Sequence, residues 1–195
     1  MFIVQDIETL GIESTSVILS NTFILVDPDA LPEDNTEAFE YLLKKSITVK
    51  FNVKEQFDKG RTTEKRVIDW WKKQSEHAKR ESLIPRATDF NGKQGIRVLR
   101  DWFSRIPNAK QIPVWVRGSL DQPCFDSFLR LYEEMPFTDY NCYRDVRTMV
   151  ELVYSNNSKA GYVEVPGFDD IRYVIKHVPS HDCAYDALMM LRGKI

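Results

Sequence analysis

The beginning of the chain carries three strand-like segments, and these constrain the fold more than any other feature. The segment Phe2 to Glu8 is short and apolar and ends in polar groups, which predicts a buried strand. Ser16 to Val26 is rich in β-branched and aromatic residues and Ser46 to Val53 alternates, so both predict further strands. Asp27-Pro28-Asp29 and Leu31-Pro32 predict a turn or loop between the second and third strands.

After the third strand the pattern becomes helical. Thr62 or Thr63 can cap a helix that runs to about Arg80. The later elements that we expect are a helix over 95–106, a strand over 113–117, helices over about 122–134 and 145–154, a polar loop opened by 155–158, and a final helix from Ser180 or Asp182 to near Gly193. Intermixed helices and strands predict an α/β protein in which helices cover a mixed sheet, as one domain over residues 1–195.

Composition excludes several classes of protein. No apolar run approaches the length of a membrane span, and no basic region precedes a cleavable apolar stretch at the N-terminus, so we expect a cytoplasmic protein with no membrane partner. Three widely spaced cysteines, Cys124, Cys142 and Cys183, form no Cys-x-x-Cys pair. They predict reduced, buried thiols rather than a zinc site or a disulfide framework.

The charge of the chain is uneven although the net charge is only −2. The segment from Lys59 to Arg80 holds eight basic residues against three acids, a local excess of +5. A solvated helix face explains such a run more often than a binding patch does, so the run alone does not indicate nucleic-acid binding.

Two acids alternate at the end of the first strand. Asp6 and Glu8 are two residues apart, so their side chains leave the same face with Cα atoms about 6.5 Å apart. Two such carboxylates repel each other unless a cation or a proton lies between them, and hard oxygen ligands suit Mg²⁺ or Mn²⁺. Taken alone, an Asp-x-Glu triplet is common, and the favoured interpretation is that both acids face solvent.

A second group of titratable residues lies near the end of the chain. Asp182 and Asp186 are at helical spacing and share a face, while His181 lies at or before the first turn. His181 is therefore either an exposed capping residue or a base that takes a proton from water at a metal. We interpret Asp182 as an acid favourably placed at a helix N-terminus. Asp186 stands alone among apolar residues and needs a partner.

Asp121 lies at the junction between a predicted strand and the following helix, with Pro123 near the first helical position. It can serve simply as the N-cap of that helix, and this interpretation and a functional one are about equally favoured.

Together these motifs resemble a known family. Asp-x-Glu, then an Asp at a strand–helix junction, then His-x-x-x-x-Asp is similar to the DEDDh branch of the 3′→5′ exonucleases, the DnaQ-like, ribonuclease-H-like group. Within it, the chain resembles the DexA-type exonucleases of T-even bacteriophages. The stretches that carry the resemblance are Asp6 to Gly11, Asp69 to Ser75, Arg117-Gly118, Arg144 to Thr148 and His181 to Met190. The resemblance implies a ribonuclease-H-like mixed sheet, with early antiparallel and later parallel strands, flanked by α-helices.

The resemblance also implies roles for individual residues. Asp6, Glu8 and Asp186 would hold one Mg²⁺ or Mn²⁺ ion, and Asp6 would bridge to a second ion, with Asp121 acting directly or through water. His181 would be the general base for the attacking water.

At the second motif the chain departs from the family. The usual pattern Asn-x-x-Phe-Asp is replaced by Arg117-Gly118-Ser119-Leu120-Asp121, and Asp126 is a rival for the second-motif acid. We prefer Asp121, because Cys124 and Phe125 follow it at three and four residues, as the apolar pair of the family does.

The expected substrate contacts are Thr9, Leu10, Trp71 and Arg117. Thr9 and Leu10 would contact the terminal nucleotide through backbone groups, with Leu10 against its base. Trp70 and Trp71 are about 100° apart on a helix, so both cannot lie at the centre of its core face, and either ring could stack on a base. In the light of the resemblance, the basic segment is a candidate phosphate-binding surface.

We therefore expect a metal-dependent exonuclease that releases nucleoside 5′-monophosphates from the 3′ ends of single-stranded DNA or RNA. One alternative is a non-catalytic module on the same fold that binds single-stranded nucleic acid. A weaker one is an enzyme that hydrolyses small phosphodiesters or free dinucleotides. Spacing does not distinguish DNA from RNA, and it names no protein partner.

Overall fold

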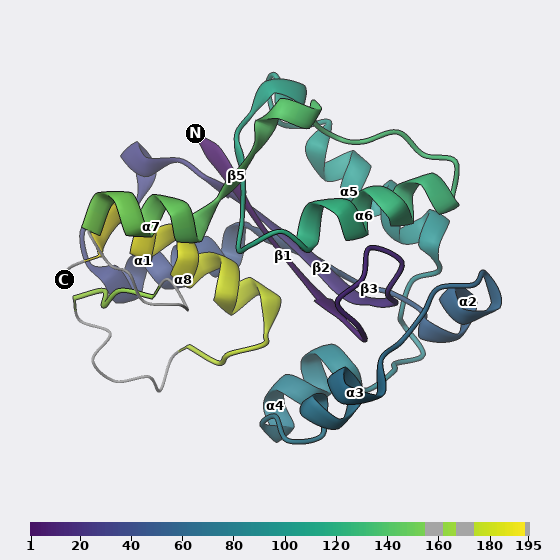
Figure 1. The fold of residues 1–195 in the computed structure, drawn as a ribbon. Helices are drawn as coiled ribbons and strands as arrows, with labels where there is room; N and C mark the ends of the chain where they lie inside the picture. The colour runs from purple at the N-terminus through teal and green to yellow at the C-terminus, as the bar shows by residue number, and fades with distance from the viewer. Residues whose placement is uncertain (155–161, 167–173, 194–195) are drawn as a thin grey trace.

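A five-stranded mixed sheet forms the centre of the protein (Figure 1). The structure is a computed structural model that describes residues 1–154, 162–166 and 174–193. The strands are β1 (Phe2–Thr9), β2 (Ile18–Val26), β3 (Ser46–Lys50), β4 (Val114–Val116) and β5 (Tyr143–Asp145). Their order across the sheet is β3-β2-β1-β4-β5. β1, β2 and β3 pair antiparallel, whereas β4 pairs parallel with both β1 and β5.

Helices cover both faces of this sheet (Figure 1). They are α1 (Asn35–Lys45), α2 (Val53–Asp58), α3 (Lys65–Trp71), α4 (Glu76–Ala78), α5 (Gly92–Phe103), α6 (Asp121–Leu131), α7 (Val146–Tyr154) and α8 (Pro179–Arg192), with a π-helical turn at Lys79–Leu83 and 3₁₀ turns at Pro28–Ala30, Ala109–Gln111 and Tyr140–Cys142. Ile3 and Ile7 of β1 pack in the apolar layer of α5 and α6, whereas Val4 packs in the layer of α1, α7 and α8. Helices α2, α3 and α4 lie beyond one end of β1 and β2.

The predicted fold class is confirmed. The early strands are antiparallel, the later ones are parallel, and helices flank the sheet, which is the arrangement of a ribonuclease-H-like fold. Among the described residues, no helix is both long enough and apolar enough to cross a bilayer.

Between β2 and β3 the structure contains more than the expected turn or loop. The Pro-containing stretch is followed by α1, whose N-cap Asp34 accepts a hydrogen bond from the Glu37 backbone N–H at 2.9 Å. The side chains of Ala38, Phe39 and Leu42 are buried against the sheet layer that contains α8. The prolines and acids before this helix obscured its short apolar face.

Two other boundaries also differ from the sequence prediction. The third strand ends at Lys50, because Asn52 caps α2 by accepting from the Glu55 backbone N–H at 2.9 Å. The helix expected to run to about Arg80 ends at Trp71, and Ser75 then caps the short helix α4. The polar loop opened by residues 155–158 lies outside the described residues.

Candidate active site

Asp6 and Glu8 reach the same face of the sheet near the end of β1. In the antiparallel register Asp6 lies opposite Thr22 and Glu8 lies opposite Ser20. Alternate residues of a strand share a face, so both acids lie on the face of Val4, which packs in the apolar layer of α8. The two carboxylates thus form the polar end of a layer that is otherwise apolar.

Helix α8 brings two further carboxylates, Asp182 and Asp186, toward these acids. Burial raises the pKa of Asp6 well above its usual value, and the nearby negative charges raise it further. Those charges belong to Glu8, Asp182, Asp121 and Asp186. The structure therefore brings together Asp6, Glu8, Asp121 and Asp186, the four acids singled out in the sequence, and adds Asp182 to them.

Asp121 begins α6, directly after the loop that follows β4, and its side chain is buried. Burial, and then the charge of Asp186, raises the pKa of Asp121 to about 8. Its rival Asp126 is half-buried, and it interacts with the charge of Arg130 and the side chain of Gln122. Of the two candidates for the second-motif acid, the structure places Asp121 in the carboxylate cluster. The helix has no side-chain N-cap hydrogen bond, so capping does not explain Asp121.

Two carboxylate oxygens of this cluster are buried without a hydrogen bond. Asp6 Oδ2 and Asp121 Oδ2 have no hydrogen-bond partner in the described part of the chain. A buried charged oxygen is costly unless it is paired, protonated or bound to a metal. Carboxylate oxygens are the ligands that Mg²⁺ and Mn²⁺ prefer, so the donor set fits divalent cations of this class.

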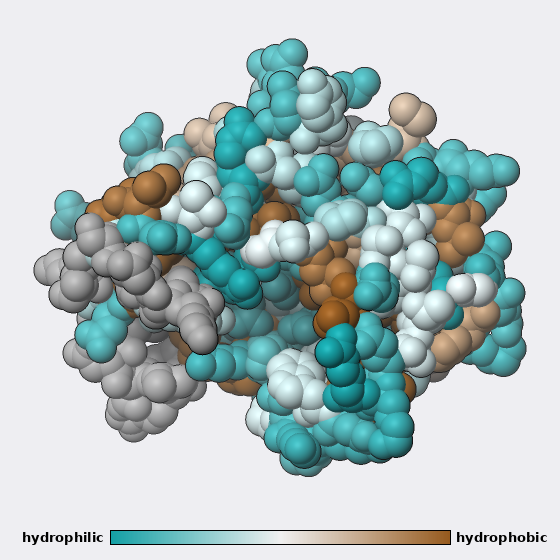
Figure 2. All heavy atoms as spheres, viewed as in Figure 1, coloured by the Kyte–Doolittle hydropathy of each residue, from teal (hydrophilic) through white to brown (hydrophobic). Residues whose placement is uncertain are grey.

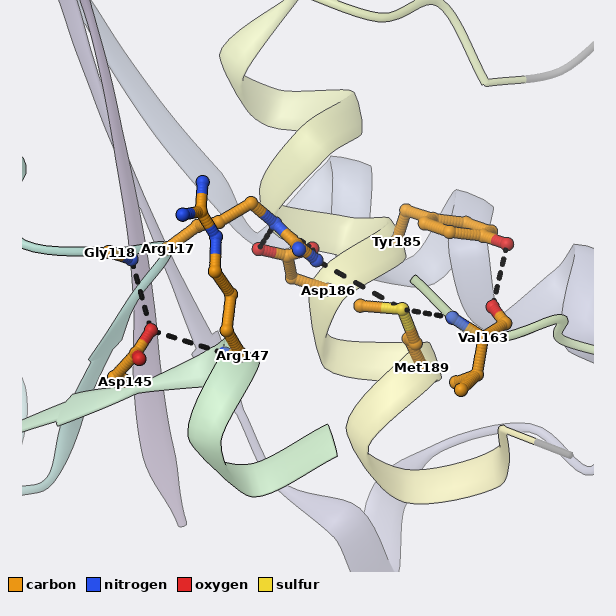
Figure 3. Close-up of polar contacts among 8 residues, drawn as sticks. All are labelled: Arg117, Gly118, Asp145, Arg147, Val163, Tyr185, Asp186 and Met189. Carbon is orange, nitrogen blue, oxygen red and sulfur yellow. Dashed lines mark hydrogen bonds and ion pairs between the residues drawn. The ribbon is translucent and has the colours of Figure 1, made fainter. Parts of the chain in front are cut away.

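Arg117, at the end of β4, is directed at Asp186 (Figure 3). Its Nε lies 3.2 Å from each carboxylate oxygen of Asp186, and a terminal nitrogen also donates to Oδ1. The guanidinium carbon lies 4.2 Å from the centroid of the Tyr162 ring. Burial alone would lower the pKa of Arg117, but the Asp186 carboxylate raises it above its ordinary value. Arg117, a predicted substrate contact, is thus already paired with one of the acids in this structure.

The loop after β4 is fixed by Asp145 at the end of β5 (Figure 3). Its Oδ1 accepts from the backbone N–H of Gly118 at 3.0 Å and from that of Arg147 at 3.1 Å. Gly118 has a φ of 89°, in the left-handed region that glycine adopts without strain. Asp145 therefore ties the loop that carries Asp121 to the first turn of α7.

His181 contacts the segment before α8 and helix α1. Its Nδ1 accepts a hydrogen bond from the Ile175 backbone N–H at 3.2 Å, and its ring meets Phe39 of α1 edge-on at 5.4 Å. These two contacts place His181 at the start of α8, next to α1.

His177 and Asp182 are residues of the site that sequence reasoning missed. His177 Nδ1 lies 3.9 Å from Glu8 Oε1, and the His177 backbone N–H donates to Asp182 Oδ2 at 2.7 Å. Burial, and then the charge of Asp186, raises the pKa of Asp182 to about 7. Asp182 lies one helical turn before Asp186, and this spacing indicates that the two side chains share a face of the helix. No local pattern marks His177.

A groove of about 560 Å³ opens beside Glu8. Its lining includes Thr9, Arg66, Trp70, Leu120, Arg147 and His177. In the space-filling view, hydrophilic side chains predominate over α3 and α4 at the lower edge of the molecule and around the hollow between these helices and α8 (Figure 2). The lining therefore combines one carboxylate, that of Glu8, with basic and aromatic side chains.

The two adjacent tryptophans have different environments. Trp71 is 0% exposed, and its Nε1 donates to the Thr9 carbonyl oxygen at 2.9 Å. Trp70 is 41% exposed and borders the groove. Trp71, the expected substrate contact, thus supports the end of β1 at the groove, whereas Trp70 presents the accessible ring.

Leu10 is also placed differently from the prediction. Its side chain is 7% exposed and packs in a cluster with Val17 and Trp71. Its backbone N–H donates to the Val17 carbonyl, and its carbonyl accepts from the Glu64 backbone N–H. Leu10 is therefore part of the support of the site, and its backbone groups are bonded within the protein. Thr9 does line the groove, and its hydroxyl donates to the Gly11 carbonyl at 2.6 Å.

The basic segment Lys59–Arg80 is largely paired within itself. Its ion pairs are Lys65 and Lys72 with Asp69, Arg66 with Glu64, and Lys79 with Glu76. Arg61 is buried and donates to the Ser16 carbonyl, which holds the β1–β2 connection against α6. Exposed pairs are weak, so these side chains remain available to a polyanion.

Comparison with known proteins agrees with this arrangement. The family described as "3'-5' exoribonuclease Rv2179c-like domain" matches residues 1–187. The chain belongs to this family. It is also 31% identical over 205 residues to a protein of Enterobacteria phage T4 named "Exodeoxyribonuclease", across 95% of this chain and 85% of that protein.

Membership of this Rv2179c-like family identifies the chain as a 3′→5′ exonuclease, an enzyme that acts on nucleic acid. Exonucleases of the family generally use divalent metal ions, and the described residues contain a carboxylate and histidine group suited to one. The predicted resemblance to the DnaQ-like exonucleases is confirmed.

Proposed function

We propose that this exonuclease removes nucleoside 5′-monophosphates one at a time from the 3′ ends of single-stranded DNA or RNA. The observation that carries the proposal is the pair of buried, unbonded oxygens Asp6 Oδ2 and Asp121 Oδ2, described above, within a cluster of five acids. Such a cluster is stable in its ionised form only with added positive charge.

Asp6, Glu8, Asp121 and Asp186 would hold two divalent cations, Mg²⁺ or Mn²⁺. When bound, such ions stabilise the attacking and leaving oxygens of an in-line displacement at phosphorus. Asp186 would exchange its bond to Arg117 for this role, which leaves the Arg117 guanidinium beside the site.

His181 would take the proton from the attacking water. Because its ring packs against Phe39 in this structure, its action requires the first turn of α8 to reorient toward Glu8. The neutral imidazole is the form that accepts a proton.

The strand would lie in the groove beside Glu8. Trp70 would stack on a base near the 3′ end, and Arg147 and Arg66 would attract the phosphates. A base face and a phosphate are common to all nucleotides, so these contacts support binding without strong sequence preference.

The test is the digestion of 5′-labelled single strands of matched DNA and RNA sequence with Mg²⁺ or Mn²⁺. We expect stepwise shortening from the 3′ end, arrest by EDTA, and mononucleotides as the released product. Cleavage of a free dinucleotide but not of the long strand would instead support the small-phosphodiester activity. Salt-dependent binding without any cleavage would contradict the proposal.

The role of His181 is tested by His181→Ala, which we expect to lower kcat roughly 10²- to 10⁴-fold with little change in strand binding. His77→Ala is the control, because His77 lies in α4 and contacts Arg80 outside the groove. An unchanged kcat in His181→Ala would remove His181 from the mechanism.

A further inference from the structure

His177 is held in one conformation by the loop before α8. Its φ is 65°, a left-handed value that is costly for a residue with a Cβ atom. Its backbone N–H donates to Asp182 Oδ2 at 2.7 Å, and its carbonyl accepts from Ser82 Oγ at 2.9 Å. The backbone is thus bonded on both sides, to α8 and to the π-helical turn.

This conformation directs the His177 ring at Glu8. One ligand atom from each of Glu8, His177 and Asp182 lies within 4.8 Å of the other two. The Trp70 ring meets the His177 ring edge-on at 4.6 Å, on the groove side. The His177 imidazole therefore contacts the Trp70 ring and lies beside the carboxylates of Glu8 and Asp182.

Glu8 is the second, independent observation at this position. Its side chain is nine-tenths buried, and within the described ranges its carboxylate accepts no hydrogen bond. The nearest positive group is the His177 ring, whose Nδ1 is 3.9 Å from Glu8 Oε1, beyond hydrogen-bonding distance. No direct hydrogen bond therefore joins the two groups, and a buried carboxylate needs a paired or positive partner.

The distances suit a small cation. Ligand atoms about 2.1 Å from a tetrahedral zinc ion lie about 3.4 Å from one another. A side-chain movement of well under the length of one bond would bring Nδ1 and Oε1 to that separation. An imidazole nitrogen favours zinc-like ions, whereas Mg²⁺ prefers oxygen ligands alone.

We propose that Glu8, His177 and Asp182 form a binding position for a transition-metal dication of the Zn²⁺ or Co²⁺ class. The position is distinct from the pair of Mg²⁺ or Mn²⁺ ions in the proposed function, with which it shares only Glu8. An ion bound here draws Glu8 toward His177, so it competes with the hard ions for one of their ligands.

The test measures metal binding directly and needs no nuclease activity. Metal-free protein is supplied with millimolar Mg²⁺ and then titrated with Zn²⁺ by calorimetry and with Co²⁺ by visible absorption. The variants are His177→Asn, since asparagine tolerates left-handed φ, and Asp182→Asn, which keeps the acceptor for the His177 N–H. His77→Ala and His181→Ala are the matched controls, because the chain has three histidines.

We expect the wild-type protein to bind one Zn²⁺ or Co²⁺ tightly enough to measure in the presence of Mg²⁺. Both Asn variants should bind these ions at least tenfold more weakly, while their Mg²⁺ affinity stays within about twofold. The two Ala controls should resemble wild type. Imidazole ¹⁵N spectra of wild-type protein should show the zinc-induced shift at His177 alone, a readout that does not depend on any variant folding.

Equal zinc affinity in wild type and His177→Asn, or a zinc-induced shift at His181 instead of His177, would overturn this proposal. Neither result bears on strand digestion with Mg²⁺. Conversely, a protein that binds Zn²⁺ through His177 but never cleaves a strand would reject the proposed function and keep this site.

Discussion

Arg117 and Asp186 form an ion pair that is almost entirely buried, with side-chain exposures of 13% and 8%. Each carboxylate oxygen of Asp186 lies 3.2 Å from Arg117 Nε. This pairing gives the carboxylate cluster positive charge from within the chain, and it links the end of β4 to the middle of α8.

Replacing Arg117 by methionine should therefore destabilise the metal-free protein. The change leaves Asp186 buried beside other acids without its partner, which costs about 3 kcal/mol or more in the free energy of unfolding. Urea unfolding in EDTA measures this loss, and saturating Mg²⁺ should restore most of it. The control is Arg100→Met, which removes the more exposed pair with Glu134 and should cost about 0.5 kcal/mol. Equal effects of the two variants would show that the buried pair has no special role.

Asp6→Asn should separate activity from stability. It removes a cation ligand, and the lost charge stabilisation of several kcal/mol corresponds to a fall of roughly a thousandfold in kcat. The same change removes a buried like charge, so the melting temperature in EDTA should rise. Asp126→Asn is the control, because Asp126 lies beside Arg130 and outside the cluster, and its activity should stay within about threefold of wild type. Full activity in Asp6→Asn would reject the ligand assignment.

The stability of the metal-free protein should fall as the pH rises. Burial raises the pKa of Asp121 to about 8 and that of Asp182 to about 7, above the value of about 3.9 for an unfolded aspartate. The folded protein therefore holds protons that the unfolded chain has released, and this contribution is lost as the pH rises through the folded pKa values.

Melting temperatures in EDTA at about pH 6.5 and about pH 8.5 test this directly. We expect the lower value at the higher pH, and a smaller difference with saturating Mg²⁺. Burial lowers the pKa of His177, so its contribution has the opposite sign, but that contribution is confined to pH values below about 6.5. A melting temperature that rises over this interval would contradict the arrangement of the acids.

The adjacent tryptophans should respond differently to substitution. Trp70→Ala removes the exposed ring and should weaken single-strand binding about tenfold, while leaving the unfolding free energy nearly unchanged. Trp71→Ala removes a fully buried side chain and should cost about 3–5 kcal/mol of stability. Fluorescence anisotropy with a labelled strand in EDTA, together with urea unfolding, distinguishes the two. The reverse pattern would return the substrate contact to Trp71.

Sequence patterns predicted β1 to β4 and most of the carboxylate cluster, but not β5 (Tyr143–Asp145). β1 was readable because an apolar run ended in alternating acids, and β4 followed by Asp121 because a short strand met a proline-marked helix start. Helix α1 was not recognised, since its apolar face is only a few residues wide and prolines precede it.

Features that depend on tertiary contacts were less accessible. Two neighbouring helical residues differ by about 100° in direction, and spacing alone does not say which of Trp70 and Trp71 faces inward. His177 enters the site through a left-handed backbone conformation and bonds to Asp182 and Ser82, which no local pattern encodes. Asp182 was interpreted by its place on a helix, whereas its burial and the charge of Asp186 decide its environment.

The alternation of side chains along β1 has a consequence for folding errors. If β1 paired with β2 one residue out of register, the side chains of Asp6 and Glu8 would enter the apolar layer of α5 and α6. Ile3 and Ile7 would then lie on the opposite face of the sheet. Such a shift in register would be strongly unfavourable. The β1–β2 pairing does change register between Glu8 and Thr9, but this position follows both acids. A molecule that completes this sheet in register therefore has Asp6 and Glu8 on the face that receives α8.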